Sequence, residues 1–133
     1  MNLIQIGRVH SPLTSRASAP RQADEDAPNA RLEVDPPYIE ALDGLRPGAD
    51  VWILTWLHQA DRTILKTHPR NDPRNPIQGV FSTRSPDRPN PIGLHRAKIL
   101  RITNHWIEVQ SLEAINDTPI IDIKPVMDCE SAY

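Results

Sequence analysis

Fourteen prolines in 133 residues leave little room for long helices in this chain. Many of them stand in two tight groups, at residues 69–76 and 86–91. Proline lacks a backbone N–H donor and fixes φ, so neither group can lie inside a helix or in a central strand. Both segments are therefore predicted to be loops of defined shape.

Short apolar segments between turn residues predict an all-β fold. Strands are expected at residues 3–9, 31–34, 51–57, 62–67, 78–82, 97–103, 106–112 and 120–124. Residues 35–44 suit one or two helical turns, with Asp35 as the cap and Gly44 past the end, and residues 17–30 suit a mobile loop. The whole chain, residues 1–133, is expected to form a small single-domain β-barrel with one short helix and long proline-rich loops.

The strand expected at residues 51–57 is apolar on both faces. Its side chains divide into two sets, with Val51, Ile53 and Leu57 on one face and Trp52, Leu54 and Trp56 on the other. A small barrel has one interior, so the tryptophan face is expected to be covered by a second copy of the chain or by the chain's own loops. We therefore predict a homodimer.

This sequence lacks the signatures of several classes of protein. No apolar run approaches the roughly 20 residues of a membrane helix, and the first residues do not resemble a signal peptide. The single cysteine, Cys129, can form no internal disulfide, and no cysteine or histidine pair has zinc spacing. The five glycines form neither GxGxxG nor a P-loop, and GxSxG and HExxH are absent. We expect a cytoplasmic protein with no metal and no membrane partner.

Residues 79–94 are the segment most suited to binding. Three prolines within six residues hold Arg84, Arg88 and Asn90 on a restricted backbone, which favours a preorganised site. Residues 62–101 also carry nine Lys or Arg and two acidic residues, although the net charge of the chain is -2. A basic face that meets RNA and an ordinary solvated surface are both compatible with this pattern, as is a plain proline-rich connector.

The same segment resembles the signature of the TsaA-like family, also called TrmO. The resemblance rests on Phe81 to Ser85 followed by Arg88-Pro89-Asn90-Pro91-Ile92-Gly93. Other blocks match in the same order, and the similarity extends over about residues 3–126: they are Ile6-Gly7, Ser11-Pro12, Pro20-Arg21-Gln22, His58-Gln59, Thr118-Pro119 and Asp122 to Pro125.

The resemblance implies a β-barrel methyltransferase that binds S-adenosylmethionine as a homodimer. Its best known members methylate N6 of threonylcarbamoyladenosine beside the tRNA anticodon. The implied cofactor residues are Pro20, Arg21, Gln22, His58, Gln59, Arg84, Leu94, Asn116, Asp117, Thr118 and Pro119. The implied substrate residues are Arg88, Asn90, Asp122 and Lys124, and the candidates for a proton-handling residue are Lys124 and His95.

This chain departs from the family pattern at several positions. Asp117 stands where glycine is usual, His95 where a small hydroxyl residue is common, and Val126 where an aromatic residue is usual. Longer relatives also carry an additional C-terminal domain.

Three functions remain open at this stage. They are a tRNA methyltransferase, a methyltransferase for another small molecule or modified nucleotide, and a non-catalytic module that binds cofactor or RNA. A structural role for His58 and an ion pair between Asp122 and Lys124 are the simpler alternatives for those residues.

Overall fold

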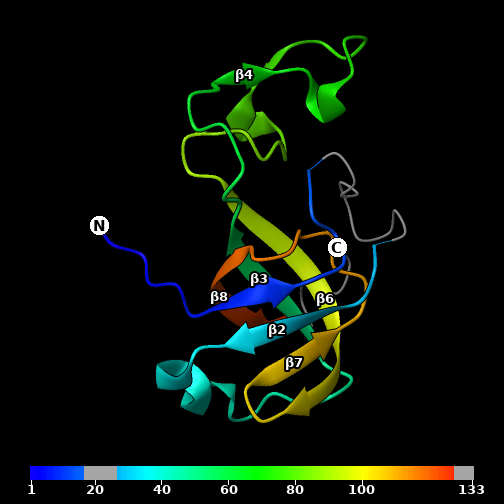
Figure 1. Ribbon diagram of the computed structural model, residues 1–133. Helices are drawn as coiled ribbons and strands as arrows, with labels where there is room; N and C mark the ends of the chain where they lie inside the picture. The colour runs from blue at the N-terminus through cyan, green and yellow to red at the C-terminus, as the bar shows by residue number, and fades with distance from the viewer. Residues whose placement is uncertain (17–26, 128–133) are drawn as a thin grey trace.

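Six antiparallel strands form a closed barrel in the computed structural model, which describes residues 1–16 and 27–127 (Figure 1). Their order around the barrel is β1-β2-β7-β6-β3-β8, and β1 closes it by pairing with both β2 and β8. The strands are β1 (Gly7–His10), β2 (Ala30–Val34), β3 (Asp50–Trp56), β6 (Ile92–Thr103), β7 (Trp106–Val109) and β8 (Pro119–Pro125). The all-β expectation is confirmed.

Aliphatic side chains fill the barrel because alternate residues of each strand point inward. On β3 the buried set is Val51, Ile53 and Thr55, while Trp52, Leu54 and Trp56 lie on the outer face. Thr55 lies on the same face as Ile53 and is fully buried, while Leu57 follows the end of β3 and is half-buried. The core is completed by Val9, Leu32, Val34, Ile99, Ile107, Val109, Leu112 and Ile120.

Residues 57–91, which we call the lobe, project from one end of the barrel between β3 and β6 (Figure 1). The strands expected at 62–67 and 78–82 shrink there to two residues each, β4 (Lys66–Thr67) and β5 (Gln78–Gly79). The proline groups on both sides of them explain this difference, since proline interrupts strand pairing.

Two barrel strands also differ from the expected bounds. β6 begins at Ile92 rather than 97, directly after Pro91, because its inward alternation already starts at Gly93. β1 begins at Gly7 rather than 3, and the side chains of Leu3 and Ile4 are exposed.

The expected short helix is present, and the described residues contain three short 3-10 segments in all. They are η1 (Pro36–Leu42), η2 (Pro69–Asn71) and η3 (Val80–Ser82). The first is the helix expected at 35–44, but the side chain of Asp35 makes no cap hydrogen bond. None of the described helices is long and apolar enough to cross a membrane. Of the loop expected at 17–30, residues 17–26 lie outside the described part of the chain, as does Cys129.

Antiparallel pairing throughout gives the barrel two distinct ends. β1, β3 and β7 run toward one end, so the connections β1–β2, β3–β6 and β7–β8 all lie there. The lobe is the β3–β6 connection, and we call this the lobe end. η1 and the β6–β7 turn lie at the opposite end (Figure 1).

Candidate functional site

The topology brings the implied cofactor segments together at the lobe end. His58 and Gln59 follow β3, Leu94 is near the start of β6, and residues 116–119 lead into β8. Arg84 lies in the lobe. Pro20, Arg21 and Gln22 belong to the β1–β2 connection but are outside the described residues. The described segments are far apart in the sequence, and the topology of the barrel places them at the same end.

Asn116 fixes the β7–β8 connection to the segment that follows β1. Its Oδ1 accepts a hydrogen bond from the backbone N–H of Ser11 at 3.0 Å, and its own N–H donates to the Leu13 carbonyl at 2.6 Å. A surface hollow of about 350 Å³ lies at this point, with His10, Ser11, Pro12, Asn29, Arg31 and Asn116 among its lining residues. Asn116 is the implied cofactor residue that lines it.

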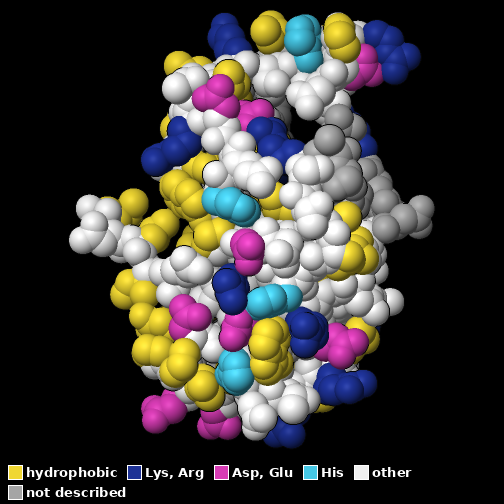
Figure 2. All heavy atoms as spheres, viewed as in Figure 1, with side chains coloured by type: hydrophobic (Ala, Val, Ile, Leu, Met, Phe, Trp, Pro, Cys, Tyr) yellow, Lys and Arg dark blue, Asp and Glu magenta, His cyan; other side chains and the backbone are white. Residues whose placement is uncertain are grey.

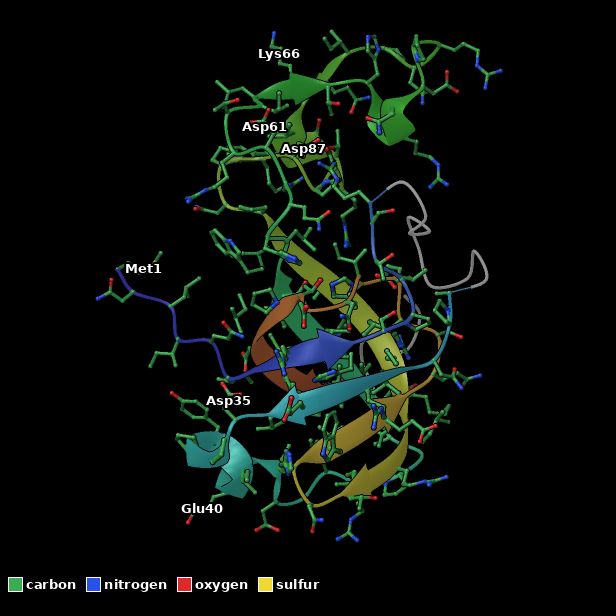
Figure 3. All side chains as sticks on the ribbon, viewed as in Figure 1. Met1, Asp35, Glu40, Asp61, Lys66 and Asp87 are labelled. Atoms are coloured by element: carbon green, nitrogen blue, oxygen red, sulfur yellow. The ribbon has the colours of Figure 1, made fainter. Side chains whose placement is uncertain are left out.

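Arg16 joins the same N-terminal segment to the lobe. Its guanidinium donates to the Gln59 carbonyl at 3.2 Å and to Asp87 Oδ2 at 3.1 Å. The other oxygen of Asp87 accepts the backbone N–H of Asp61 at 2.8 Å, and Figure 3 shows these two aspartates near each other within the lobe. Residues 11–16 thus run from Asn116 to the lobe and lead directly into the segment that contains Pro20 to Gln22.

Asp61 is kept ionised by its neighbour in the chain. Hydrogen bonds from the Thr63 hydroxyl, at 2.6 Å, and from its backbone N–H, at 2.8 Å, hold the pKa of the Asp61 carboxyl below its ordinary value. The turn after β3 is therefore a rigid, negatively charged element beside Asp87.

Arg88 organises the signature loop from inside. Its Nε donates to the Ser85 carbonyl at 2.7 Å, and its Nη2 donates to the carbonyls of Val80 at 2.7 Å and Thr83 at 2.5 Å. The resemblance had implied that Arg88 binds the substrate. In the structure the side chain is half-buried, and its guanidinium is directed into the loop instead. The preorganisation expected of this loop thus has a specific cause.

Asn90 has a comparable structural contact. Its Oδ1 accepts a hydrogen bond from Arg62 Nη2 at 3.2 Å, while Arg62 Nε donates to the Pro89 carbonyl at 2.7 Å. The Arg62 guanidinium also lies 5.0 Å from the centre of the Trp56 ring. One arginine therefore clamps both ends of the lobe together.

Arg84 remains available for a ligand. Its side chain is exposed and has no hydrogen-bond or ion-pair partner in the described part of the chain. Phe81, three residues earlier, is 85% exposed. His58 is also exposed, at the junction of β3 and the lobe. These side chains project from a backbone that Arg88, Arg62 and Asp87 hold in place.

Residues 117–119 form a tight corner at the start of β8. Asp117 has a φ of 68°, in the left-handed region that glycine adopts most readily. Its backbone N–H donates to the Val9 carbonyl at 2.8 Å, and its exposed carboxylate lies 3.6 Å from Arg8. The buried Thr118 hydroxyl donates to the Ile115 carbonyl at 2.7 Å, so Thr118 stabilises the corner.

The two candidates for proton transfer lie in different surroundings. His95 is only 5% exposed and points into the barrel, where it cannot contact a substrate at the surface. Lys124 is exposed on the outer face and forms an ion pair of 2.8 Å with Asp122. Strand register places Asp122 beside Leu54 and Leu54 beside Leu94, so an implied substrate residue and an implied cofactor residue share one outer row.

A second group of charged side chains covers the outer face of β1, β2 and β7. Figure 2 shows a mixed row of basic, acidic and histidine side chains on the side toward the viewer. Its centre is Glu33, which accepts hydrogen bonds from His10 at 2.8 Å and Arg8 at 3.3 Å. The bond from His10 is the main cause that holds the pKa of Glu33 below its ordinary value.

Sequence reasoning missed the residues that hold the site together. Arg16 bonds to residues 43 and 71 positions away, so no local pattern indicated it. Asp87 was inside the signature segment, where a lone carboxylate between two arginines was the only available signal. Thr55 and Glu113, which both contact the buried His95 side chain, gave no sequence signal, because a buried polar contact depends on strand register.

Comparisons with known proteins agree with this arrangement. A family model described as the tRNA-methyltransferase O N-terminal domain matches residues 8–129. A protein of Methanocaldococcus jannaschii named a probable S-adenosyl-L-methionine-binding protein is 48% identical over 97 residues, which is 70% of this chain and 77% of that protein. VirR of Rhizobium radiobacter, with the same description, is 39% identical over 124 residues, covering 93% of this chain and 70% of VirR.

A solved structure is also similar. The crystal structure of TrmO from Pseudomonas aeruginosa matches with a TM-score of 0.79 at 29% identity. The match covers 100% of this chain and 59% of the TrmO chain. This chain therefore spans less than two thirds of the length of that protein.

Proposed function

This chain belongs to the family of tRNA-methyltransferase O N-terminal domains, and on that basis we propose that it is an S-adenosylmethionine-dependent methyltransferase whose cofactor binds at the lobe end. The observation that carries the proposal is the segment 11–16, which bonds to Asn116 on one side and to Gln59 and Asp87 on the other. These bonds join the segment after β1 to the lobe and to the β7–β8 connection, so the three connections form one continuous surface.

The donor set of this surface fits the cofactor. S-adenosylmethionine supplies a methyl group on a sulfonium, and it also presents a carboxylate, a ribose and an adenine. Arg84 is an exposed guanidinium with no partner in the described residues, which suits the carboxylate. The hollow beside Asn116 offers hydroxyl, amide and imidazole groups, and its volume of about 350 Å³ falls in the usual range for small-molecule sites.

Calorimetry with S-adenosylmethionine tests the proposal. Arg84→Ala should weaken binding by about 1.5–3 kcal/mol, which is roughly 10- to 150-fold in Kd, because a charge-assisted hydrogen bond is lost. Arg46→Ala is the matched control, since Arg46 is an exposed arginine in the β2–β3 connection at the opposite end of the barrel. Absence of binding to the wild-type chain, or equal losses in both variants, would contradict the assignment.

For the substrate, we propose the threonylcarbamoyl-modified adenosine of a tRNA in the cytoplasm, methylated at N6. That nitrogen belongs to a urea-like group and is a weak nucleophile, so catalysis depends on holding it in line with the methyl carbon. The nitrogen attacks the methyl carbon, the N–C bond forms as the S–C bond breaks, S-adenosylhomocysteine leaves and the N6 proton passes to solvent. Arg84 and Lys66 are two of the exposed cations on the lobe, and they suit an RNA backbone.

A transfer assay with labelled cofactor tests this substrate. Label should enter tRNA that carries the threonylcarbamoyl group and not tRNA that lacks it. Lys66→Ala should weaken tRNA binding and reduce its salt dependence, while Arg46→Ala should change neither. Label that appears only in a small-molecule extract would favour a different methyl acceptor.

We propose further that the chain acts as a homodimer through the outer face of β3 and β6. The pairs Trp56–Ile92 and Leu54–Leu94 lie in register there, and Ile92 and Leu94 are each 42% exposed. Arg62 and Arg96 cover part of the two tryptophans, at 5.0 and 5.9 Å from the ring centres. Light scattering at micromolar concentration should give twice 15.0 kDa for the wild type and a monomer for Leu54→Glu. A wild-type monomer would contradict the dimer.

A further inference from the structure

A chain of three polar side chains is buried in the barrel just below the lobe end. The Thr55 hydroxyl of β3 lies 2.7 Å from His95 Nε2 of β6, and His95 Nδ1 lies 2.5 Å from Glu113 Oε1. Thr55 is fully buried, and the side chains of His95 and Glu113 are 6% and 14% exposed. None of these three side chains reaches the surface where a ligand would bind, so the three take no direct part in chemistry.

The donors and acceptors of these three side chains allow the two hydrogen bonds to run in one direction, from Thr55 through His95 to Glu113. The Glu113 carboxylate is an acceptor, so His95 Nδ1 carries a proton and donates to it. The Thr55 hydroxyl then donates to the unprotonated Nε2, since the alternative leaves its hydrogen without an acceptor in the described residues. This pattern of donors and acceptors assigns the proton of the imidazole to Nδ1 and leaves Nε2 as the acceptor.

Glu113 belongs to the connection that carries the candidate site. Residues 110–118 join β7 to β8, and their inward side chains Leu112, Ala114 and Ile115 are buried. Three successive backbone N–H groups follow, those of Asn116, Asp117 and Thr118, and they donate to the carbonyls of Leu13, Val9 and Ile115. A shift of Glu113 is therefore expected to reach Asn116, the residue of this connection that lines the hollow.

Packing alone does not account for this arrangement. Glu113 Oε2 is buried and has no hydrogen-bond partner within residues 1–16 and 27–127, which is unfavourable compared with an apolar side chain of similar size. What a carboxylate provides, and an apolar side chain does not, is a directional bond to His95, which is itself oriented by Thr55. The polar chain therefore fixes the height and orientation of the connection at the barrel end.

We infer that Glu113, held by His95 and Thr55, is a positioning residue that presets the β7–β8 connection for cofactor binding. This inference rests on the proposed function for its ligand, but its structural part is independent of any ligand.

Hydrogen exchange tests the structural part without a cofactor. In Glu113→Leu, the amides of Asn116, Asp117 and Thr118 should exchange about tenfold faster or more, while those of β2 and β7 keep their protection. Glu113→Gln keeps an acceptor for Nδ1–H and should restore slow exchange. Ile107→Val, a core substitution in β7 away from the connection, is the control and should leave amides 116–118 unchanged.

The other measurements use the wild type and the cofactor. Long-range ¹⁵N spectra of wild-type His95 should show a protonated Nδ1 and an unprotonated Nε2, and this result stands even if Glu113→Leu fails to fold. Calorimetry should show an S-adenosylmethionine Kd at least about tenfold higher for Glu113→Leu and unchanged for Ile107→Val.

The outcomes separate the two proposals. If the wild type binds the cofactor but Glu113→Leu binds it equally well, the positioning role is refuted. The same follows from unchanged exchange at residues 116–118 or from an Nε2–H tautomer. If the wild type binds no cofactor, the proposed function fails, and hydrogen exchange still decides whether Glu113 orders the connection.

Discussion

Gly93→Ala should destabilise the barrel strongly, although alanine usually stabilises a position with ordinary backbone angles. Gly93 has no positive φ, so the reason for glycine is space. A Cβ built there would lie 2.4 Å from Thr55 Oγ1, 2.7 Å from His95 Nε2 and 3.1 Å from Leu57 Cδ2. The added methyl group would occupy the place where the threonine and histidine meet.

The magnitude follows from two contributions. Overpacking a filled core costs about 1–3 kcal/mol. If the Thr55 hydroxyl rotates away, it and His95 Nε2 are left buried without each other, which costs about another 1–3 kcal/mol. The free energy of unfolding should therefore fall by about 2–6 kcal/mol, a large part of the 5–15 kcal/mol typical of a domain.

Urea unfolding followed by tryptophan fluorescence measures this loss. Gly79→Ala is the matched control, because its Cβ would have no neighbour nearer than 4.0 Å and its φ is -62°. That variant should be neutral or up to about 1 kcal/mol more stable, through the lower entropy of its unfolded chain. The reasoning is refuted if Gly93→Ala is as stable as Gly79→Ala.

Further substitutions test other contacts. Arg88→Ala should lower the free energy of unfolding by about 1–3 kcal/mol and increase proteolysis of residues 80–88. Arg88→Lys should not restore stability, since an ammonium group cannot reach all three carbonyls. Variants that resist proteolysis as well as the wild type would count against this role of Arg88. Gly7→Ala should abolish or severely weaken folding, because its Cβ would lie 2.2 Å from the Glu33 carbonyl oxygen, and a normal urea midpoint would disprove that contact. The pKa of Glu33 is lower in the folded than in the unfolded protein, so the ionised carboxylate contributes to stability above its ordinary pKa, and this contribution is lost as the pH falls through the folded pKa. Glu33→Gln should therefore make the free energy of unfolding less dependent on pH between about pH 5 and 3. An unchanged pH dependence in this variant would show that the bond to His10 adds nothing to stability.

The sequence predicted the architecture well where one pattern determined it. Alternation and turn residues indicated the barrel strands β2, β3, β7 and β8 to within a few residues, because burial of one face gives a period of two. It failed in the lobe, where apolar residues such as Leu65, Ile77 and Phe81 are exposed and the short strands β4 and β5 end at the proline groups.

The candidate site was predicted less completely, for a physical reason. The segments that supply it were identified by resemblance, and the antiparallel topology brings the described ones to one end. The tasks of individual side chains were not readable, because Arg88 and Arg84 are four positions apart in one loop and differ only in where the backbone turns. His95 points inward because β6 begins five residues earlier than its apolar run suggested.

The bonds that Arg88 makes have a consequence for how this loop can change. They end on backbone carbonyls, which every amino acid possesses, so these three bonds do not themselves require a particular residue at the positions that accept them. Phe81 is 85% exposed on that frame and can be exchanged with little effect on the path of the loop. A library varied at position 81, with Arg84 retained for the cofactor and Arg88 for the loop, is therefore a rational starting point for altering which methyl acceptor the domain receives.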